Sequence, residues 1–158
     1  MVNQSRAPTI HSIYIHGSIM EEIKMTLHSL YENYYFHDSN IISVEYNAAA
    51  ASLRMAVDFC CWMQENYHED EPQCRKMLLT FSGVTEYRAE GTNHDGTFSR
   101  IHCGDIYEEN KVAALTEIDN GGLRFDCYSY TDDEEDIWQE ILIYAKDVSV
   151  TMGEPLND

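Results

Sequence analysis

The stretch most suggestive of catalysis is His37, Asp38 and Ser39, which are consecutive and hold the three side-chain types of a hydrolase triad. A nucleophile, a base and its orienting carboxylate must converge on one another in space, and immediate neighbours on a chain cannot do so. We therefore interpret Asp38 and Ser39 as residues that hydrogen-bond nearby backbone amides where a helix is followed by a strand.

Five cysteines could supply metal ligands or redox groups, but their spacing favours neither use. Cys60 and Cys61 are adjacent, and the chain has no C-x-x-C motif. Because adjacent strand residues point to opposite faces, we expect one of the two to be buried and the other half exposed. The odd number of cysteines and the absence of a secretory signal predict free thiols and a cytoplasmic protein.

His94, His102 and Cys103 form a local cluster of metal-ligand types within residues 88–104, a stretch expected to be mostly loop with a short strand at residues 97–102. Two histidines eight residues apart do not match the ligand spacing of a structural zinc site. Whether these three residues bind a metal stays open, and the sequence predicts no metal and no cofactor. The acidic run at residues 131–136 lacks the alternating oxygen ligands and central glycine of a calcium loop.

The net charge is unusual: 28 acidic and 10 basic residues leave a formal charge of −18. A negative field of this size repels phosphate backbones and anionic lipids, which disfavours nucleic-acid and membrane-surface roles. No stretch approaches the roughly 20 apolar residues of a membrane-spanning helix. The charge either attracts a basic partner or a cation, or simply keeps the protein soluble.

Alternating apolar residues across residues 37–59 predict an antiparallel hairpin with one buried face. Before it, Ile13 and Ile15 suggest a short edge strand, and Ser18 with Glu21 has the form of a capping box. Apolar residues at helical spacing then predict an amphipathic helix from Ser18 to residues 33–36. The inward hairpin positions are Ile42, Val44, Tyr46, Leu53, Met55, Val57 and Phe59, and the helical stripe is Ile19, Ile23, Leu27, Leu30, Tyr31 and Tyr34.

Four further segments are predicted to be strands. Residues 77–87 form one with an interruption at Gly83, and residues 137–152 form a long one with a β-bulge near Lys146. Asn120 and Gly121 predict a second hairpin between residues 112–118 and 123–130. Its inner face is Leu123, Phe125 and Cys127, with Arg124, Asp126 and Tyr128 outward.

These elements predict a single domain over residues 1–158, loose at residues 1–8 and with a tail at residues 153–158. The expected fold class is α+β: a curved antiparallel sheet or sandwich of five to seven strands, covered by one main N-terminal amphipathic helix.

The order of these motifs resembles small uncharacterised bacterial domains similar to immunity proteins of polymorphic-toxin systems. The motifs are His37-Asp38-Ser39-x-Ile41, Leu53-x-Met55-x-Val57-x-Phe59, Phe81-x-Gly83-Val84 and Ile141-x-Ile143-x-Ala145-x-x-Val148-x-Val150. The resemblance implies an inhibitor of a protein partner. It assigns no functional residue, because such inhibitors share no active-site motif.

Two functional hypotheses follow. The first is a non-catalytic acidic protein that docks a basic partner, such as a toxin, through tyrosines and carboxylates. Its predicted contact residues surround the acidic run: Tyr128, Tyr130, Asp132, Asp133, Glu134, Glu135 and Trp138. The alternative is a small-ligand-binding protein or hydrolase-like enzyme using dispersed residues in a concave sheet, namely some subset of His94, His102, Asp105, Glu45 and Asp58. Self-association through an apolar patch is a third reading.

Overall fold

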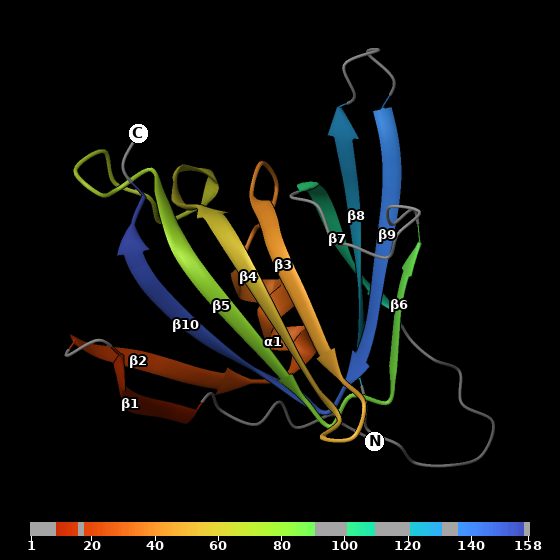
Figure 1. The fold of residues 1–158 in the computed structure, drawn as a ribbon. Coiled ribbons are helices and arrows are strands. Elements are labelled where there is room, and N and C mark those ends of the chain that lie inside the picture. The colour runs from red at the N-terminus through yellow and green to blue at the C-terminus, as the bar shows by residue number, and fades with distance from the viewer. Residues whose placement is uncertain (1–8, 16–17, 91–100, 110–120, 131–135, 157–158) are drawn as a thin grey trace.

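The computed structural model describes residues 9–15, 18–90, 101–109, 121–130 and 136–156, which form one antiparallel sheet of ten strands and a single short α-helix (Figure 1). The strands lie in the order β1-β2-β10-β5-β4-β3-β7-β8-β9-β6. The predicted fold class is therefore wrong, both in its five to seven strands and in its main N-terminal helix. The elements are β1 (Thr9–Ile15), β2 (Ser18–Met25), α1 (Leu27–Asn33), β3 (Asn40–Asn47), β4 (Ser52–Cys60), a 3-10 turn η1 (Cys61–Met63), β5 (Cys74–Ser82), β6 (Glu86–Glu90), β7 (Ile101–Glu109), β8 (Gly121–Tyr130), β9 (Asp136–Ala145) and β10 (Asp147–Pro155).

The first half of the predicted helix is a strand instead. Residues 18–25 form β2, which pairs with β1 on one side and with β10 on the other. The helix begins only after Thr26, whose hydroxyl oxygen accepts a hydrogen bond from the amide of Ser29 at 3.1 Å. Ile19 and Ile23 are four residues apart, a spacing that is even and so suits a strand as well as a helix. Pairing with β10 decided between the two.

The sheet folds into two halves, and the chain passes from one half to the other at two places (Figure 1). One half contains β1, β2, β10, β5, β4 and β3, and the other contains β7, β8, β9 and β6. β5 passes into β6 through Gly83, which has a φ of +64°, and β9 passes into β10 through Lys146. The amide of Lys146 donates to the carbonyl of Ser82 at 3.0 Å, so the two crossings are held together. The predicted interruption at Gly83 is confirmed, but it divides residues 77–87 between two strands, β5 and β6. The prediction of one long strand over residues 137–152 with a β-bulge near Lys146 is wrong, because the chain ends β9 at Ala145 and begins β10, a strand of the other half, at Asp147.

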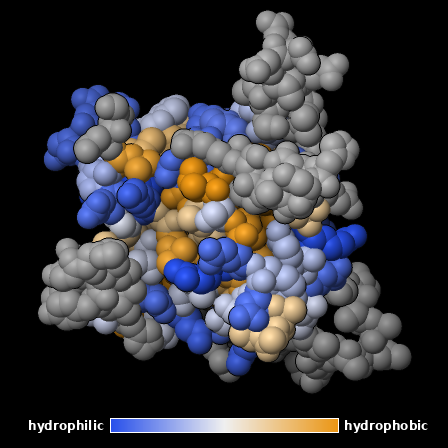
Figure 2. All heavy atoms as spheres, in the orientation of Figure 1, coloured by the Kyte–Doolittle hydropathy of each residue, from blue (hydrophilic) through white to orange (hydrophobic). Residues whose placement is uncertain are grey.

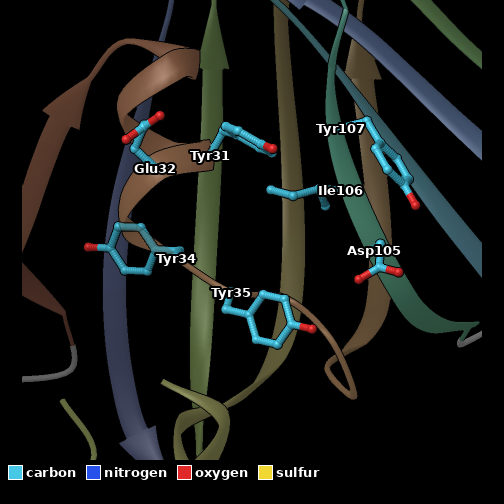
Figure 3. Close-up of a pocket in the computed structure, with 7 residues that line it drawn as sticks. All are labelled: Tyr31, Glu32, Tyr34, Tyr35, Asp105, Ile106 and Tyr107. Carbon is cyan, nitrogen blue, oxygen red and sulfur yellow. The ribbon is translucent and has the colours of Figure 1, made fainter. Parts of the chain in front are cut away.

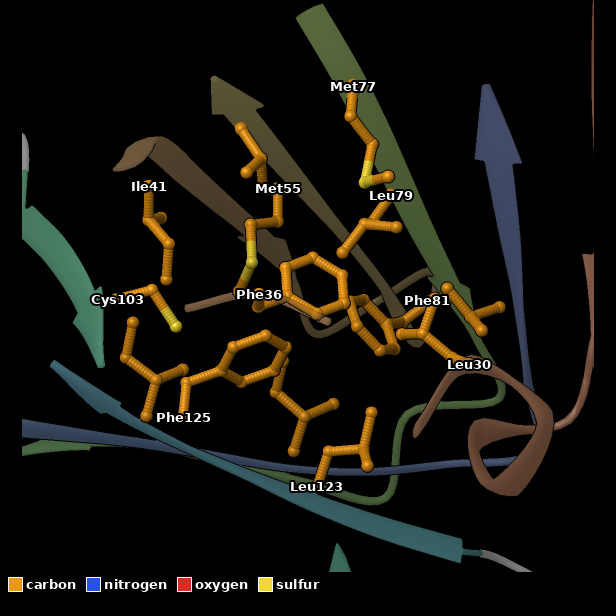
Figure 4. Packing of buried hydrophobic residues seen from close by; sticks show 14 of the residues in the cluster. Leu30, Phe36, Ile41, Met55, Met77, Leu79, Phe81, Cys103, Leu123 and Phe125 are labelled. Atoms are coloured by element: carbon orange, nitrogen blue, oxygen red, sulfur yellow. The ribbon is translucent and has the colours of Figure 1, made fainter. Parts of the chain in front are cut away.

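The hydrophobic core lies between the two halves (Figure 4). Phe36, which follows α1, packs edge to face against Phe59 of β4 and Phe125 of β8. The distances between ring centroids are 5.4 Å and 5.8 Å, respectively. The inward positions predicted for β4 and β8 are confirmed. Fully buried core residues of these two strands are Leu53, Met55, Val57, Phe59, Leu123, Phe125 and Cys127.

Several strand predictions need correction. The hairpin of β3 and β4 is confirmed, but a register shift between Ile41 and Ser43 makes Ile41 the buried residue of β3, while Tyr46 is 42% exposed. β8 pairs with β7 on one side and with β9 on the other. Residues 112–118, its predicted hairpin partner, lie outside the described residues. β7 replaces part of the predicted loop, and β10 extends to Pro155, into the predicted tail. Residues 1–8 and 91–100 lie outside the described residues.

Within the described ranges, no helix is long and apolar enough to span a bilayer. Figure 2 shows apolar surface gathered at the centre of one face, with hydrophilic side chains around it.

Candidate binding site

A groove of about 480 Å³ lies between α1 and β7 (Figure 3). We call it the tyrosine groove, because four of its seven described lining residues are tyrosines. In Figure 3, Tyr31 and Tyr35 extend from the side of α1 toward Ile106 of β7. The lining residues are Tyr31, Glu32, Tyr34, Tyr35, Asp105, Ile106 and Tyr107.

The groove exists because β3 and β7 separate after a very short pairing. They are in register only at Asn40 with His102 and at Ile41 with Ile101. The remainder of β7 pairs with β8 alone, and α1 packs near its other edge. A sheet edge that faces a helix leaves a hollow wherever the intervening side chains do not fill it. The divergence of two strands thus creates the site.

The groove is acidic and aromatic. Glu32 and Asp105 provide two carboxylates, and none of the described lining residues is basic. A guanidinium, that of Arg124, lies 4.7 Å from the ring centroid of Tyr107. Arg124 is itself bound by Glu109 at 2.7 Å and by Asp126 at 2.9 Å. Its charge is therefore already compensated, and the groove has the electrostatics of a cation-binding surface.

Exposed aromatic surface is concentrated here. Six large hydrophobic side chains are exposed among the described residues, and three of them, Tyr31, Tyr35 and Tyr107, line the tyrosine groove. Burial raises the pKa of Tyr34, which lines the groove and packs edge to face on Phe59. Tyrosines that offer a ring face and a hydroxyl to solvent are typical of binding surfaces.

His28 joins the two walls at one end of the groove. Its Nδ1 hydrogen-bonds a carboxylate oxygen of Glu108 on β7, and its Nε2 lies 3.7 Å from Glu32, one turn further along α1. The hydrogen bond to Glu108 raises the pKa of His28 above its usual 6.5, with partial desolvation acting in the opposite sense. The pair thus links α1 to β7 most strongly when His28 is protonated.

Stability should consequently depend on pH through His28. Because the folded-state pKa is raised, this contribution is fully present below the unfolded pKa of 6.5 and is lost as the pH rises through the folded pKa. We expect the difference in free energy of unfolding between wild type and His28→Gln to shrink as the pH is raised from about 5.5 to about 8. Urea unfolding measures the difference in free energy of unfolding, and NMR titration of the His28 ring measures its pKa. Glu108→Gln should move the His28 pKa back toward 6.5, and a wild-type pKa at or below that value would contradict the prediction.

A second group of polar residues, which we call the histidine cluster, adjoins the groove. It consists of His37, Asp38, His102 and Asp105. A carboxylate oxygen of Asp38 lies 3.6 Å from Nε2 of His37 and 3.5 Å from Nε2 of His102. Nδ1 of His37 lies 3.6 Å from Asp105 and hydrogen-bonds the carbonyl of Gly104 at 2.7 Å, which requires that nitrogen to carry the proton. Asp38 adopts a positive φ of 65°, a conformation that aspartate tolerates in turns.

Ser39 is turned away from this cluster. It is fully buried, and its hydroxyl oxygen accepts a hydrogen bond from the amide of Cys60 at 2.9 Å. The prediction that Ser39 bonds a nearby backbone amide is wrong, because its amide partner, Cys60, is 21 residues away at the end of β4. Within the described parts of the chain, no group of three or more histidine, cysteine or acidic side chains is arranged to hold a metal ion.

The structure brings together part of each predicted residue set. Tyr128 and Trp138 are opposite each other in β8 and β9, and His102 is opposite Tyr128 on the other side, with ring centroids 5.0 Å apart. The side chains of Tyr130 and Trp138 are not described, and Asp132, Asp133, Glu134 and Glu135 lie outside the described residues. That contact set stays a prediction.

The residues of the enzyme hypothesis are only partly assembled. His102 and Asp105 fall in the histidine cluster, whereas Glu45 is exposed near the far end of β3, opposite Arg54. Asp58 is opposite Asn40, whose amide oxygen lies 2.9 Å from Nδ1 of His102. His94 lies outside the described residues.

The cysteine prediction is partly wrong. Cys60 and Cys61 are both buried, since η1 begins at Cys61 and turns its side chain inward instead of continuing the strand alternation. All five thiols are free.

Sequence reasoning missed most of the tyrosine groove. It assigned Tyr31 and Tyr34 to the apolar stripe of a long helix and did not single out Glu32, Tyr35 or Tyr107. The available signal was the density of tyrosines and acids in the segment Tyr31-Glu32-Asn33-Tyr34-Tyr35 and again at residues 105–107. Compared with protein-family models, curated proteins and solved structures, the chain matches none of them.

Proposed function

We propose that the protein is a non-catalytic acidic binding protein that docks a basic segment of another protein, in the manner of an immunity-type inhibitor. The tyrosine groove is the centre of its docking surface. The observation that carries the proposal is the combination of four tyrosines and two carboxylates, without a basic lining residue, in one groove of a chain with a net charge of −18.

Each part of this surface suits an arginine or lysine side chain. Ring faces attract a cation through their quadrupole, and a carboxylate beside the ring supplies a charge-assisted hydrogen bond. Tyrosine provides large contact area at low cost in side-chain entropy. The surrounding negative field accelerates encounter with a basic partner.

The docking surface extends beyond the groove in this proposal. Asp105 lines the groove and lies 3.6 Å from His37, and Asp38 in turn connects His37 to His102. His102 faces Tyr128 of the predicted contact set. A partner lying along this line would contact the groove first and Tyr128 second.

The test compares two charge-matched variants. Glu32→Gln with Asp105→Asn removes two carboxylates from the groove, and Glu45→Gln with Glu69→Gln removes two from exposed positions elsewhere. Binding of an arginine-rich peptide is measured by calorimetry at several salt concentrations, with a glycine-serine peptide of equal length as reference. We expect the groove variant to bind about tenfold more weakly, equivalent to about 1.4 kcal/mol, and the control to stay within about twofold.

An equal loss in both variants would show that only the overall charge matters and would contradict a site in the groove. The inhibitor role has its own test, which is co-expression with the product of the neighbouring gene. A neighbour that encodes no basic toxin would count against that role while leaving peptide binding untouched.

The histidine cluster supports a second candidate, a small-ligand site that uses imidazole and carboxylate groups. The supporting observation is that two segments distant in sequence meet here: Asp38 lies near His37 and His102, and His37 lies near Asp105, with His102 and Asp105 both on β7. A His37→Gln, His102→Gln double variant distinguishes the candidates, because peptide docking centred on the groove should largely survive it.

A further inference from the structure

Four of the five cysteines form two directly opposed pairs on neighbouring antiparallel strands. Cys60 at the end of β4 is in register with Cys74 at the start of β5, and Cys103 of β7 is in register with Cys127 of β8. In sequence these partners are separated by 13 and by 23 residues, so the sheet register alone brings them together.

Both pairs occupy non-hydrogen-bonded positions of their ladders. The next pair along from Cys60 and Cys74 is hydrogen-bonded, since the amide of Cys61 donates to the carbonyl of Gln73 at 2.7 Å. The amide of Cys60 instead donates to the hydroxyl of Ser39, on the side away from β5. Directly opposed residues at such positions have Cα atoms about 4.5 Å apart, within the range of about 4.4–6.8 Å that disulfides span.

Ser39 enforces the same alignment in the second pair. Its carbonyl accepts from the amide of Cys103 at 2.8 Å, so the backbone of Cys103 also points away from its cysteine partner. One buried residue thereby orients one cysteine of each pair.

Solvent access distinguishes the two pairs. Cys103 and Cys127 have no exposed surface, and contact with Cys127, followed by burial, raises the pKa of Cys103. Cys60 is also buried, and burial together with the neighbouring Cys74 thiol raises its pKa to about 11. Cys74 is partly exposed, so an external reagent can reach this pair through Cys74.

We propose that Cys60 and Cys74 form a reversible intramolecular disulfide in the presence of a low-molecular-weight disulfide such as oxidised glutathione. The Cys74 thiolate attacks one glutathione sulfur, which forms a mixed disulfide and releases one reduced glutathione. Cys60 then loses its proton and attacks the Cys74 sulfur, which forms the protein disulfide and releases the second glutathione. The two cysteine thiols together lose two electrons and two protons, and oxidised glutathione takes up both.

The disulfide closes the loop of residues 61–73 at its base. That loop includes Gln64, whose side-chain amide donates to the carbonyl of Tyr35 at 2.6 Å and whose side-chain oxygen accepts from the amide of Tyr35 at 3.0 Å. Oxidation therefore fixes the segment that holds Tyr35 in place.

Peptide mapping of the full chain tests the proposal. After incubation with oxidised glutathione, remaining thiols are blocked under denaturing conditions and the protein is digested with a protease that cleaves after glutamate. Trypsin is unsuitable, because no lysine or arginine separates Cys60 from Cys74, whereas Glu65 and Glu69 do. We expect a linked peptide pair joining the segment of Cys60 and Cys61 to that of Cys74, which dithiothreitol separates.

Variants identify the partner. Cys61→Ser should keep the link, whereas Cys60→Ser and Cys74→Ser should each abolish it. Because Cys74 is partly exposed, Cys74→Ser is the variant least expected to disturb folding. Three results would overturn the proposal: a link that survives Cys60→Ser, a Cys74 that carries only glutathione, or a Cys103–Cys127 link that forms equally fast.

Discussion

Replacing Phe36 with alanine is expected to lower the free energy of unfolding by about 3–5 kcal/mol, which is a large share of the 5–15 kcal/mol that stabilises a typical domain. Phe36 is 1% exposed and lies on no strand. Its ring contacts Phe59 from one half of the sheet and Phe125 from the other, so its removal leaves a cavity where the two halves meet.

Urea unfolding followed by far-ultraviolet circular dichroism measures the loss. Phe36→Leu retains most of the side-chain volume and should cost clearly less, and it also provides a graded result if the alanine variant does not fold. Tyr46→Ala, at a residue 42% exposed, is the surface control, expected to cost about 1 kcal/mol or less. A Phe36→Ala variant as stable as that control would show that the two halves do not depend on this ring.

The importance of Phe36 was not predictable from periodicity. Alternation identified the buried faces of β4 and β8 correctly, because each strand buries every second residue against one core. Phe36 lies in a connecting segment, where no period applies and burial depends on the three-dimensional path of the chain.

The helix prediction failed for a different reason. Spacing of four residues satisfies both a helix face and a strand face, and the capping-box pattern at Ser18 resolved the ambiguity in the wrong direction. The open edge of β10 pairs with β2, an interaction between segments more than 120 residues apart in sequence. Local pattern reasoning has no access to such a partner.

The tyrosine groove was equally beyond local reasoning. Its walls come from residues 31–35 and 105–107, and its existence depends on β3 and β7 separating after two residue pairs. The sequence shows tyrosines and acids in both segments, but not that these segments face each other. Charge and composition suggested a basic partner and a contact set around the acidic run, and neither pointed to this groove.

Replacing Gly83 with alanine is the second change expected to have a large effect. Gly83 has a φ of +64°, which costs an L-residue about 1–2 kcal/mol. An added Cβ would also lie 2.8 Å from Cβ of Lys146, and Cβ atoms cannot move aside without the backbone. Overpacking of this kind costs about 1–3 kcal/mol, so the expected total is about 2–5 kcal/mol. Gly121→Ala, whose Cβ would meet Leu27 at an ordinary 3.4 Å, is the matched control, expected to change stability by less than about 1 kcal/mol.

A double-mutant cycle separates the two costs. Lys146→Gly removes the atom that an alanine at position 83 would meet, so in that background Gly83→Ala should lose only the backbone-strain part, about 1–2 kcal/mol. Equal costs in both backgrounds would show that the crossings of β5 to β6 and of β9 to β10 are not in contact there. Coupling between Gly83 and Lys146 would show that the β5-to-β6 and β9-to-β10 connections, each marked separately in the sequence, are in contact and act together. Both connections pass from one half of the sheet to the other, so their contact sets the space that Phe36 fills.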